Sequence, residues 1–173
     1  MKRILLTGMS GAGKSTMIKM LTERGCQAID MDLDGWSHWI DKNTGQPATP
    51  PADGSFAWDS LDWVWNEKRL SERLRTRDDD SLVVAGTTIN QKKFYPFFDV
   101  IVLLSAPTAV ILQRLARRPD NSYGQTPRSR ERILGHIVTV EPRLRASADL
   151  EINTNRPPEE VLADILRLLK PSS

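Results

Sequence analysis

A glycine-rich stretch near the start of the chain constrains the fold more than any other feature. Residues 8–16 read Gly-Met-Ser-Gly-Ala-Gly-Lys-Ser-Thr and contain the pattern G-x-x-x-x-G-K-[ST], directly after the apolar run 4–7 and before an amphipathic segment. Glycines allow backbone conformations that a Cβ would forbid, so the amides of such a loop can converge on an anion, and the positive end of the following helix adds to the same point. This strand, loop and helix context predicts the binding of a nucleoside triphosphate.

The residue types within the loop predict individual roles. Lys14 is expected to reach the β- and γ-phosphates, and the Ser15 hydroxyl to coordinate Mg²⁺, so ATP and Mg²⁺ are the predicted cofactors. The predicted cofactor-binding residues of the loop are Gly8, Ser10, Gly11, Ala12, Gly13, Lys14, Ser15 and Thr16. The alternative is a glycine-rich turn that caps a helix without a ligand, and the flanking segments favour the phosphate-binding interpretation.

Size and composition predict a single domain and a cytoplasmic location. A chain of 173 residues can bury a substantial core. Its apolar runs are shorter than the ~18 residues that span a bilayer, and it enters a strand within three residues, so neither a membrane segment nor a secretory signal is expected. The single cysteine, Cys26, excludes an internal disulfide and a multi-cysteine zinc site. We therefore expect a cytoplasmic protein.

The charge distribution is uneven but does not favour nucleic acid. Twelve acids face six bases between Asp30 and Asp80, whereas eight arginines face three acids between Arg114 and Arg145. The net charge is only +2, and the chain has no lysine-rich stripe with repeated aromatic residues. The expected partner is a small-molecule acceptor, with no nucleic acid and no membrane, and the chain is expected to be a monomer or a homodimer.

Short apolar runs alternate with helical periods along the chain. Strands are predicted at 3–7, 27–31, 81–85, 100–104 and 150–153, and helices at 14–24, 60–75, 108–117, 128–146 and 158–169. This alternation predicts an α/β fold of three layers, with a five-stranded parallel sheet and helices on both faces. Such sheets bind ligands at the carboxyl ends of their strands. Two polar segments, 43–55 and 119–127, are candidate lids or plain surface loops.

Three aspartates follow the second predicted strand at alternate positions. On an extended chain Asp30, Asp32 and Asp34 would point to the same side. Like charges this close are costly without compensation, which Mg²⁺ or a substrate proton can supply. One carboxylate, of Asp32 or Asp34, would then accept the proton of an attacking hydroxyl. A solvated strand end is the alternative.

Arginines and tryptophans form two further groups. Arg114 and Arg118 are four residues apart on one predicted helix face, where they can close over the phosphates or simply form a basic helix end; for Arg117 the solvated alternative is equally good. All five tryptophans, Trp36, Trp39, Trp58, Trp63 and Trp65, fall within thirty residues. They predict an aromatic acceptor pocket, for which we select Trp36 and Trp58, or a satellite core. Arg69 is expected to meet an anionic acceptor group or to be solvated.

Together these motifs resemble the compact P-loop kinases of small metabolites, the group of shikimate, gluconate and adenylate kinases. The stretch GMSGAGKST matches their phosphate loop, Asp30-Met31-Asp32 resembles the D-x-D pair of shikimate kinases, and Arg114 to Arg118 is similar to the R-x-x-x-R at the lid entrance of gluconate and adenylate kinases. Residues 152–157 are like the last strand and the loop beside the adenine ring. The resemblance covers nearly the whole chain.

The resemblance implies a P-loop NTPase fold in a single kinase domain, 1–173, with an acceptor-binding insert at about 35–77 and a lid at about 118–128. By residue, it implies Asp30 as the Mg²⁺ organiser, Asp32 as acceptor binder or base, Arg118 at the phosphates, and Asn155 with Pro157 near adenine. Shikimate kinases carry a triple-glycine turn after the third strand, whereas this chain has Gly86-Thr87-Thr88-Ile89-Asn90. Gly86, Thr87 and Asn90 are still placed where they can bind an acceptor hydroxyl.

The predicted function is an ATP-dependent phosphotransferase that acts on a hydroxyl of a sugar, nucleoside, shikimate-like or antibiotic acceptor. Lys14, Asp32, Asp34 and Arg118 are the predicted catalytic residues, and Asp32, Asp34, Trp36, Trp58, Arg69, Gly86, Thr87 and Asn90 the predicted acceptor-binding residues. One alternative is a nucleoside monophosphate kinase, which needs arginines on the acceptor side. The other is a nucleotide-dependent ATPase or switch that acts on a protein partner.

Overall fold

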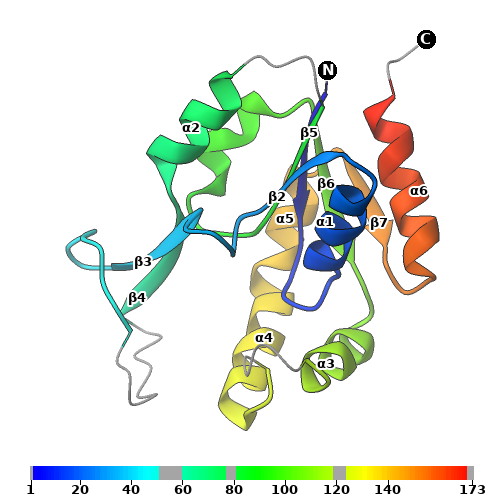
Figure 1. The fold of residues 1–173 in the computed structure, drawn as a ribbon. Helices are drawn as coiled ribbons and strands as arrows, with labels where there is room; N and C mark the ends of the chain where they lie inside the picture. The colour runs from blue at the N-terminus through cyan, green and yellow to red at the C-terminus, as the bar shows by residue number, and fades with distance from the viewer. Residues whose placement is uncertain (1, 51–59, 77–80, 119–123, 171–173) are drawn as a thin grey trace.

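The computed structural model describes residues 2–50, 60–76, 81–118 and 124–170. Its centre is a parallel five-stranded sheet with the order β2-β5-β1-β6-β7 (Figure 1). The strands are β1 (Arg3–Thr7), β2 (Gln27–Asp30), β5 (Leu82–Ala85), β6 (Val100–Ser105) and β7 (Leu150–Asn153). The predicted α/β class is therefore confirmed. The middle strands are buried on both faces, which explains why they read as continuous apolar runs.

Helices cover both faces of the sheet. Ile4 and Leu6 of β1 face a cluster with helices α1 (Lys14–Glu23) and α6 (Pro158–Leu169). Leu5 faces the opposite layer, which contains α2 (Glu67–Arg75), the 3-10 helix η1 (Gln91–Phe97), α3 (Thr108–Ala116), α4 (Pro127–Thr139) and α5 (Glu141–Ser147). Figure 1 shows α1 and α6 together on one side of the sheet. Among the described residues, no helix combines the length and apolar character needed to cross a membrane.

The helix predicted over 60–75 is wrong in its first part. Residues Leu61–Trp65 form strand β4, which pairs antiparallel with β3 (Ser37–Asp41) in a separate two-stranded sheet. The segment is rich in tryptophan and contains a β-branched valine, both of which favour strands. Helix α2 begins only after Asn66, whose side chain accepts a hydrogen bond from the Arg69 amide and caps the helix.

The helix predicted over 128–146 is two helices. The first, α4, ends at Thr139, and α5 starts at Glu141 with Pro142 in its first turn. Proline lacks the amide hydrogen that a continuous helix would need and its ring clashes with the carbonyl four residues earlier, so the break falls at this point.

The sheet register places three loops side by side. Ala85 of β5 is the register partner of Leu6 on one side and of Asp30 on the other. The segments that follow β1, β2 and β5 therefore leave the sheet at the same edge, where α/β proteins bind ligands. Trp58 and parts of the insert and lid predicted at 35–77 and 118–128 lie outside the described residues.

Candidate active site

The glycine-rich loop joins β1 to α1 as the motif predicted. Gly8 has a φ of 147°, and a Cβ there would lie 2.3 Å from the Leu104 carbonyl oxygen. Gly13 has a φ of 101° and stands at the N-terminus of α1. Only glycine meets both conditions without strain, so the loop brings its amides and the helix start to one point.

Lys14 points back into this loop. Its Nζ donates hydrogen bonds to the carbonyl oxygens of Gly8, at 2.7 Å, and Met9, at 3.1 Å. Burial lowers the pKa of the ammonium, while the negative charges of Asp32 and Asp30 act to raise it and Arg118 acts to lower it. Four predicted residues from three segments of the chain thus share one electrostatic environment. A bound anion would compensate the cost of burying this ammonium.

The three aspartates do not line up along an extended chain as predicted. Strand β2 ends at Asp30, and the chain then turns, with the Asp32 amide donating to Asp30 Oδ1 at 3.0 Å and Asp34 in the left-handed region at a φ of 53°. Within the described ranges, no group of three or more histidine, cysteine or acidic residues is arranged to hold a metal ion. Magnesium takes only one or two protein ligands and completes its shell with phosphates and water, so the assignment of Ser15 and Asp30 to Mg²⁺ stays a prediction.

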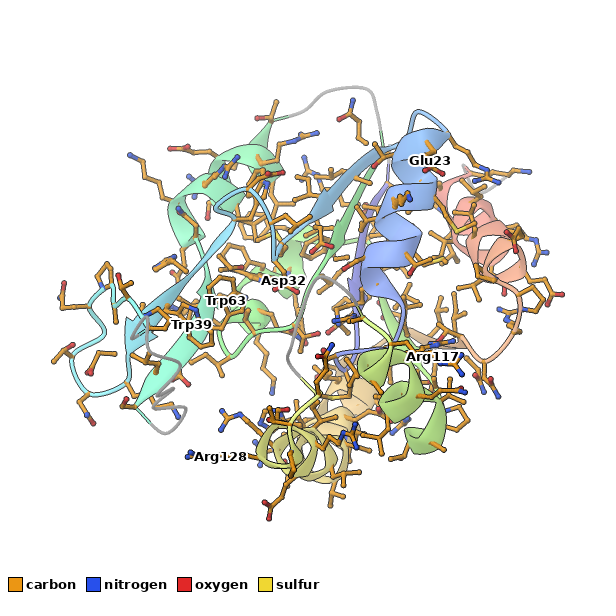
Figure 2. The ribbon with its side chains drawn as sticks, turned by 60° about the horizontal axis from the view of Figure 1, so that its bottom comes forward. Glu23, Asp32, Trp39, Trp63, Arg117 and Arg128 are labelled. Atoms are coloured by element: carbon orange, nitrogen blue, oxygen red, sulfur yellow. The ribbon has the colours of Figure 1, made fainter. Side chains whose placement is uncertain are left out.

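Asp32 lies beside the hairpin formed by β3 and β4. Its Oδ1 accepts a hydrogen bond from Trp63 Nε1 at 2.9 Å. Figure 2 shows Trp63 between Asp32 and Trp39 on the side of the hairpin that faces the rest of the site. Sequence reasoning missed Trp63 as a partner of the candidate base because it placed this residue on a helix. The alternation of Trp63 and Trp65 was the available signal, since residues two apart on a strand share a face.

Two of the predicted acceptor-binding residues, Gly86 and Thr87, follow β5 and make contacts within the protein that support the site. The Thr87 hydroxyl donates to the Gly8 carbonyl, at 2.8 Å, and accepts from the Gly8 amide, at 3.1 Å. Gly86 is buried, and a Cβ there would meet Met31 Cβ at 2.8 Å. Gly86 permits this close packing, and Thr87 ties the β5 loop to the phosphate loop.

Asn90 is also engaged within the protein. Its Nδ2 donates to the Trp65 carbonyl and to Glu67 Oε1, both at 3.1 Å. Its Oδ1 accepts from the Trp65 amide at 3.0 Å and from the Thr88 hydroxyl at 2.9 Å. These contacts use every donor and acceptor position of the side-chain amide. The residue therefore joins the β5 loop to the start of α2.

Trp36 and Arg69 pair with each other on the acceptor side. The Arg69 guanidinium lies 3.8 Å from the centroid of the Trp36 ring and donates a short hydrogen bond to the Asp34 carbonyl. Stacking and hydrogen bonding of this kind hold the arginine in place.

A cavity of about 360 Å³ lies on the donor side. It is lined by the phosphate loop, the end of α3 and the connection from β7 to α6, including Gly11, Gly13, Thr16, Arg114, Arg117, Arg118, Thr154 and Pro158. Thr154 and Pro158 belong to its lining, whereas Asn155 and Pro157 do not, so the expected contact of these two residues with adenine stays a prediction. Thr154 turns inward because its hydroxyl donates to the Ala12 carbonyl at 2.9 Å.

The arginines of α3 have distinct surroundings. Arg114 donates to Gly11 O at 3.2 Å and to the Thr154 hydroxyl at 2.9 Å, so it fastens the loop to the end of β7. Arg117 and Arg118 line the same cavity, and Figure 2 shows Arg117 near the phosphate loop. Three cations around one cavity suit a polyphosphate. The sequence pattern predicted Arg114 and Arg118 on one helix face, but α3 ends at Ala116, so Arg117 and Arg118 both follow the helix and line the cavity from beyond its end.

Comparisons with known proteins agree with this architecture. A family profile described as an AAA domain matches residues 4–135. The structure is similar to that of shikimate kinase from Acinetobacter baumannii in complex with shikimate, with a TM-score of 0.64 and 25% identity over 97% of this chain and 92% of that one. A search of curated protein sequences finds no match.

Two further solved structures share the fold. A gluconokinase from Sinorhizobium meliloti has a TM-score of 0.57 and 22% identity over 97% of this chain and 93% of that one. A sugar kinase from a Janibacter species has a TM-score of 0.56 and 17% identity over 96% and 92% of the two chains. The expected likeness to the P-loop small-molecule kinases is thereby confirmed.

Proposed function

The chain belongs to the AAA domain family, and from that premise we propose that it transfers the γ-phosphoryl group of ATP to a hydroxyl of a small molecule. The observation that carries this proposal is the sheet register, which brings the loop with Lys14, after β1, and the turn with Asp30 and Asp32, after β2, to the same edge of the sheet. A phosphate-binding lysine with a carboxylate beside it supplies both the charge compensation and the base that phosphoryl transfer to an alcohol needs.

The residues take separate roles in this reaction. Lys14 binds the β- and γ-phosphates, and the nearby Arg118 neutralises charge on the transferring group. Ser15 and Asp30 would hold Mg²⁺, which supplies further charge neutralisation between the phosphates. Asp32 accepts the proton of the acceptor hydroxyl, whose oxygen bonds to the γ-phosphorus as the bond to the departing ADP breaks.

Asp32 is a better base than Asp34 on the contacts around each. The Asp32 carboxylate is oriented by Trp63, whereas Asp34 sits in a left-handed turn whose carbonyl accepts from Arg69. Arg69 and Arg73 are the two arginines that a nucleoside monophosphate kinase would use to bind its acceptor phosphate. Because Arg69 already contacts Trp36 and the Asp34 carbonyl, an acceptor that presents a hydroxyl fits the site better than one that presents a phosphate.

The test is ADP formation by the purified chain with ATP and Mg²⁺ against sugars, cyclitols, nucleosides, nucleoside monophosphates, shikimate-like acids and aminoglycosides. We expect at least one alcohol acceptor to raise the rate well above the acceptor-free background and to appear as a phosphorylated product. A rate that rises only with nucleoside monophosphates would favour that kinase class. A rate that rises only with a protein partner, without phosphorylated product, would favour an ATPase switch and refute the proposal.

A further inference from the structure

One face of the hairpin carries a line of tryptophans from the core to the surface. Trp39 and Trp63 are direct partners in the register of β3 and β4, and their ring centroids lie 4.9 Å apart at 52°. Trp65, two residues further along the same face, is fully buried and packs on Phe94. Trp39 and Trp63 remain half-buried. We refer to this pair as the tryptophan platform.

The candidate base lies at the edge of the tryptophan platform. Asp32 Oδ1 is 2.9 Å from Trp63 Nε1, so a ring stacked on Trp63 presents its own substituents to this carboxylate. An indole can stack on a saturated sugar-like ring or on a nucleobase. In a nucleoside the hydroxyls are on the ribose, so a stacked base would carry them away from Asp32. A hydroxylated saturated ring can stack on Trp63 and at the same time present a hydroxyl to Asp32.

Three cations among the described residues of the acceptor side have partners of their own. Lys42 pairs with Asp62 at 3.6 Å and Lys93 pairs with Glu67 at 2.7 Å. Arg69 stacks on Trp36. An acidic acceptor that used one of these three cations would have to break its contact, and it would also meet the negative charge of Asp32. A neutral acceptor incurs neither cost.

We propose that the acceptor is a neutral, saturated, polyhydroxylated ring, a carbohydrate or cyclitol, which stacks on the tryptophan platform with a ring hydroxyl against Asp32. Trp63 acts twice: its indole face binds the ring, and its N–H positions the carboxylate. This inference rests on the proposed function. In the step itself, the ring oxygen bonds to the γ-phosphorus, ADP departs with the electrons of the broken bond, and Asp32 takes the proton.

The first experiment measures kcat and KM with ATP and Mg²⁺ for neutral aldohexoses, aldopentoses and inositols, for gluconate and shikimate, and for nucleosides. We expect the highest kcat/KM for a neutral ring, by about 10-fold or more, which is the value of a few well-placed contacts in a pocket. A charged acid or a nucleoside as the best acceptor would overturn the proposal.

Two substitutions separate the roles of Trp63. Trp63→Leu removes the stacking face and should raise KM for the ring about 10-fold or more. Trp63→Phe keeps an aromatic face but removes the N–H, so KM should stay near the wild-type value while kcat falls. An unchanged KM in the Leu variant and an unchanged kcat in the Phe variant would contradict both roles.

Trp39→Leu supplies a second test of stacking, and His38→Ala is the matched control because His38 lies on the opposite face of β3. Thermal unfolding of each variant identifies any loss of folding. A KM that rises in Trp39→Leu and stays constant in His38→Ala supports the platform, whereas equal effects of both on KM refute it.

Binding without turnover distinguishes this inference from the proposed function. Saturation-transfer NMR with Asp32→Asn and a non-hydrolysable ATP analogue reports contact between ring protons and the protein. If the ring binds but wild type transfers nothing to it, the platform stands and the transfer function fails. If an acyclic or charged acceptor is phosphorylated instead, the function stands and the platform fails; if neither is observed, both fail.

Discussion

Backbone atoms build the donor side of the candidate site, whereas side chains from a hairpin build the acceptor side. On the donor side Gly8 and Gly13 shape the loop, and Lys14 and Arg114 donate to its carbonyl oxygens. On the acceptor side the side chains of Asp32 and Trp63 meet although they are 31 positions apart in sequence: Asp32 lies in the turn after β2, and Trp63 lies on the hairpin that projects from the main sheet (Figure 1). The donor side is thus specified locally, and the acceptor side by tertiary packing.

This difference predicts that the two sides tolerate substitution differently. A phosphate loop should be sensitive to changes of backbone conformation, because its amides must converge on one anion. A two-stranded hairpin can exchange its exposed side chains at little cost to the core, since its own stability comes from buried positions such as Trp65. Hydrogen bonds from Thr87 to Gly8 and from Asn90 to Trp65 connect the donor side to the acceptor side.

The largest effect is expected for Lys14→Ala. It removes the cation that binds the transferring phosphates, so kcat/KM for phosphoryl transfer should fall by about 1,000-fold, and ATP binding should weaken, as in sites that lose a main charge-stabilising donor. Steady-state kinetics and calorimetric titration with ATP measure both quantities. Lys19→Ala, on an exposed position of the same helix, is the control. Wild-type activity in the Lys14 variant would break the donor assignment.

The second largest effect on activity is expected for Asp32→Asn. Removal of the base should lower kcat by about 100-fold or more, while the affinity for ATP changes less than twofold because Asp32 belongs to the acceptor side. Glu23→Gln makes the same chemical change at the far end of α1 (Figure 2) and should leave both values unaltered. If Asp32→Asn abolished ATP binding instead, the division into two sides would be incorrect.

A smaller effect is expected when the hydrogen bonds between Thr87 and Gly8 are removed. Thr87→Val keeps the shape but leaves the Gly8 amide and carbonyl without the hydroxyl, which should lower the free energy of unfolding by about 1–3 kcal/mol and weaken ATP binding. Thr87→Ser retains the hydroxyl and should restore most of both. Urea unfolding and ATP titration provide the measurements. Equal behaviour of the valine and serine variants would show that the hydroxyl does not hold the loop.

The smallest effect concerns Glu67, at the start of α2. A hydrogen bond from Lys93, with a second from Asn90, lowers the pKa of this carboxyl from its ordinary value of 4.5. The folded state therefore binds fewer protons, so the contribution to stability is fully present above about pH 4.5 and is lost as pH falls through the lowered value. The pair is well exposed, so the difference between wild type and Glu67→Gln should be about 0.5 kcal/mol at pH 7. Urea midpoints at pH 7 and pH 3 test whether this difference disappears in acid.

Sequence reasoning was most successful where pattern and structure are both local. The five strands of the main sheet, the phosphate loop and the helices beside it follow from apolar runs and from a motif whose spacing a loop must satisfy. It failed over residues 61–65, because a short aromatic segment reads equally well as helix or strand until its partner strand is known. The single helix predicted over 128–146 overlooked Pro142.

The sequence by itself determined the loop on the donor side of this protein: a glycine-rich stretch with Lys14 and Ser15 between a strand and a helix allows few conformations, and its pattern predicts a phosphate site. Only the tertiary structure decided the rest. It showed that Thr87 and Asn90 support the frame, that Thr154 turns into the donor cavity, and that Trp63 meets Asp32. These are contacts between residues distant in the chain, and no local pattern encodes them, because they depend on which strands pair and on what packs beneath the loops.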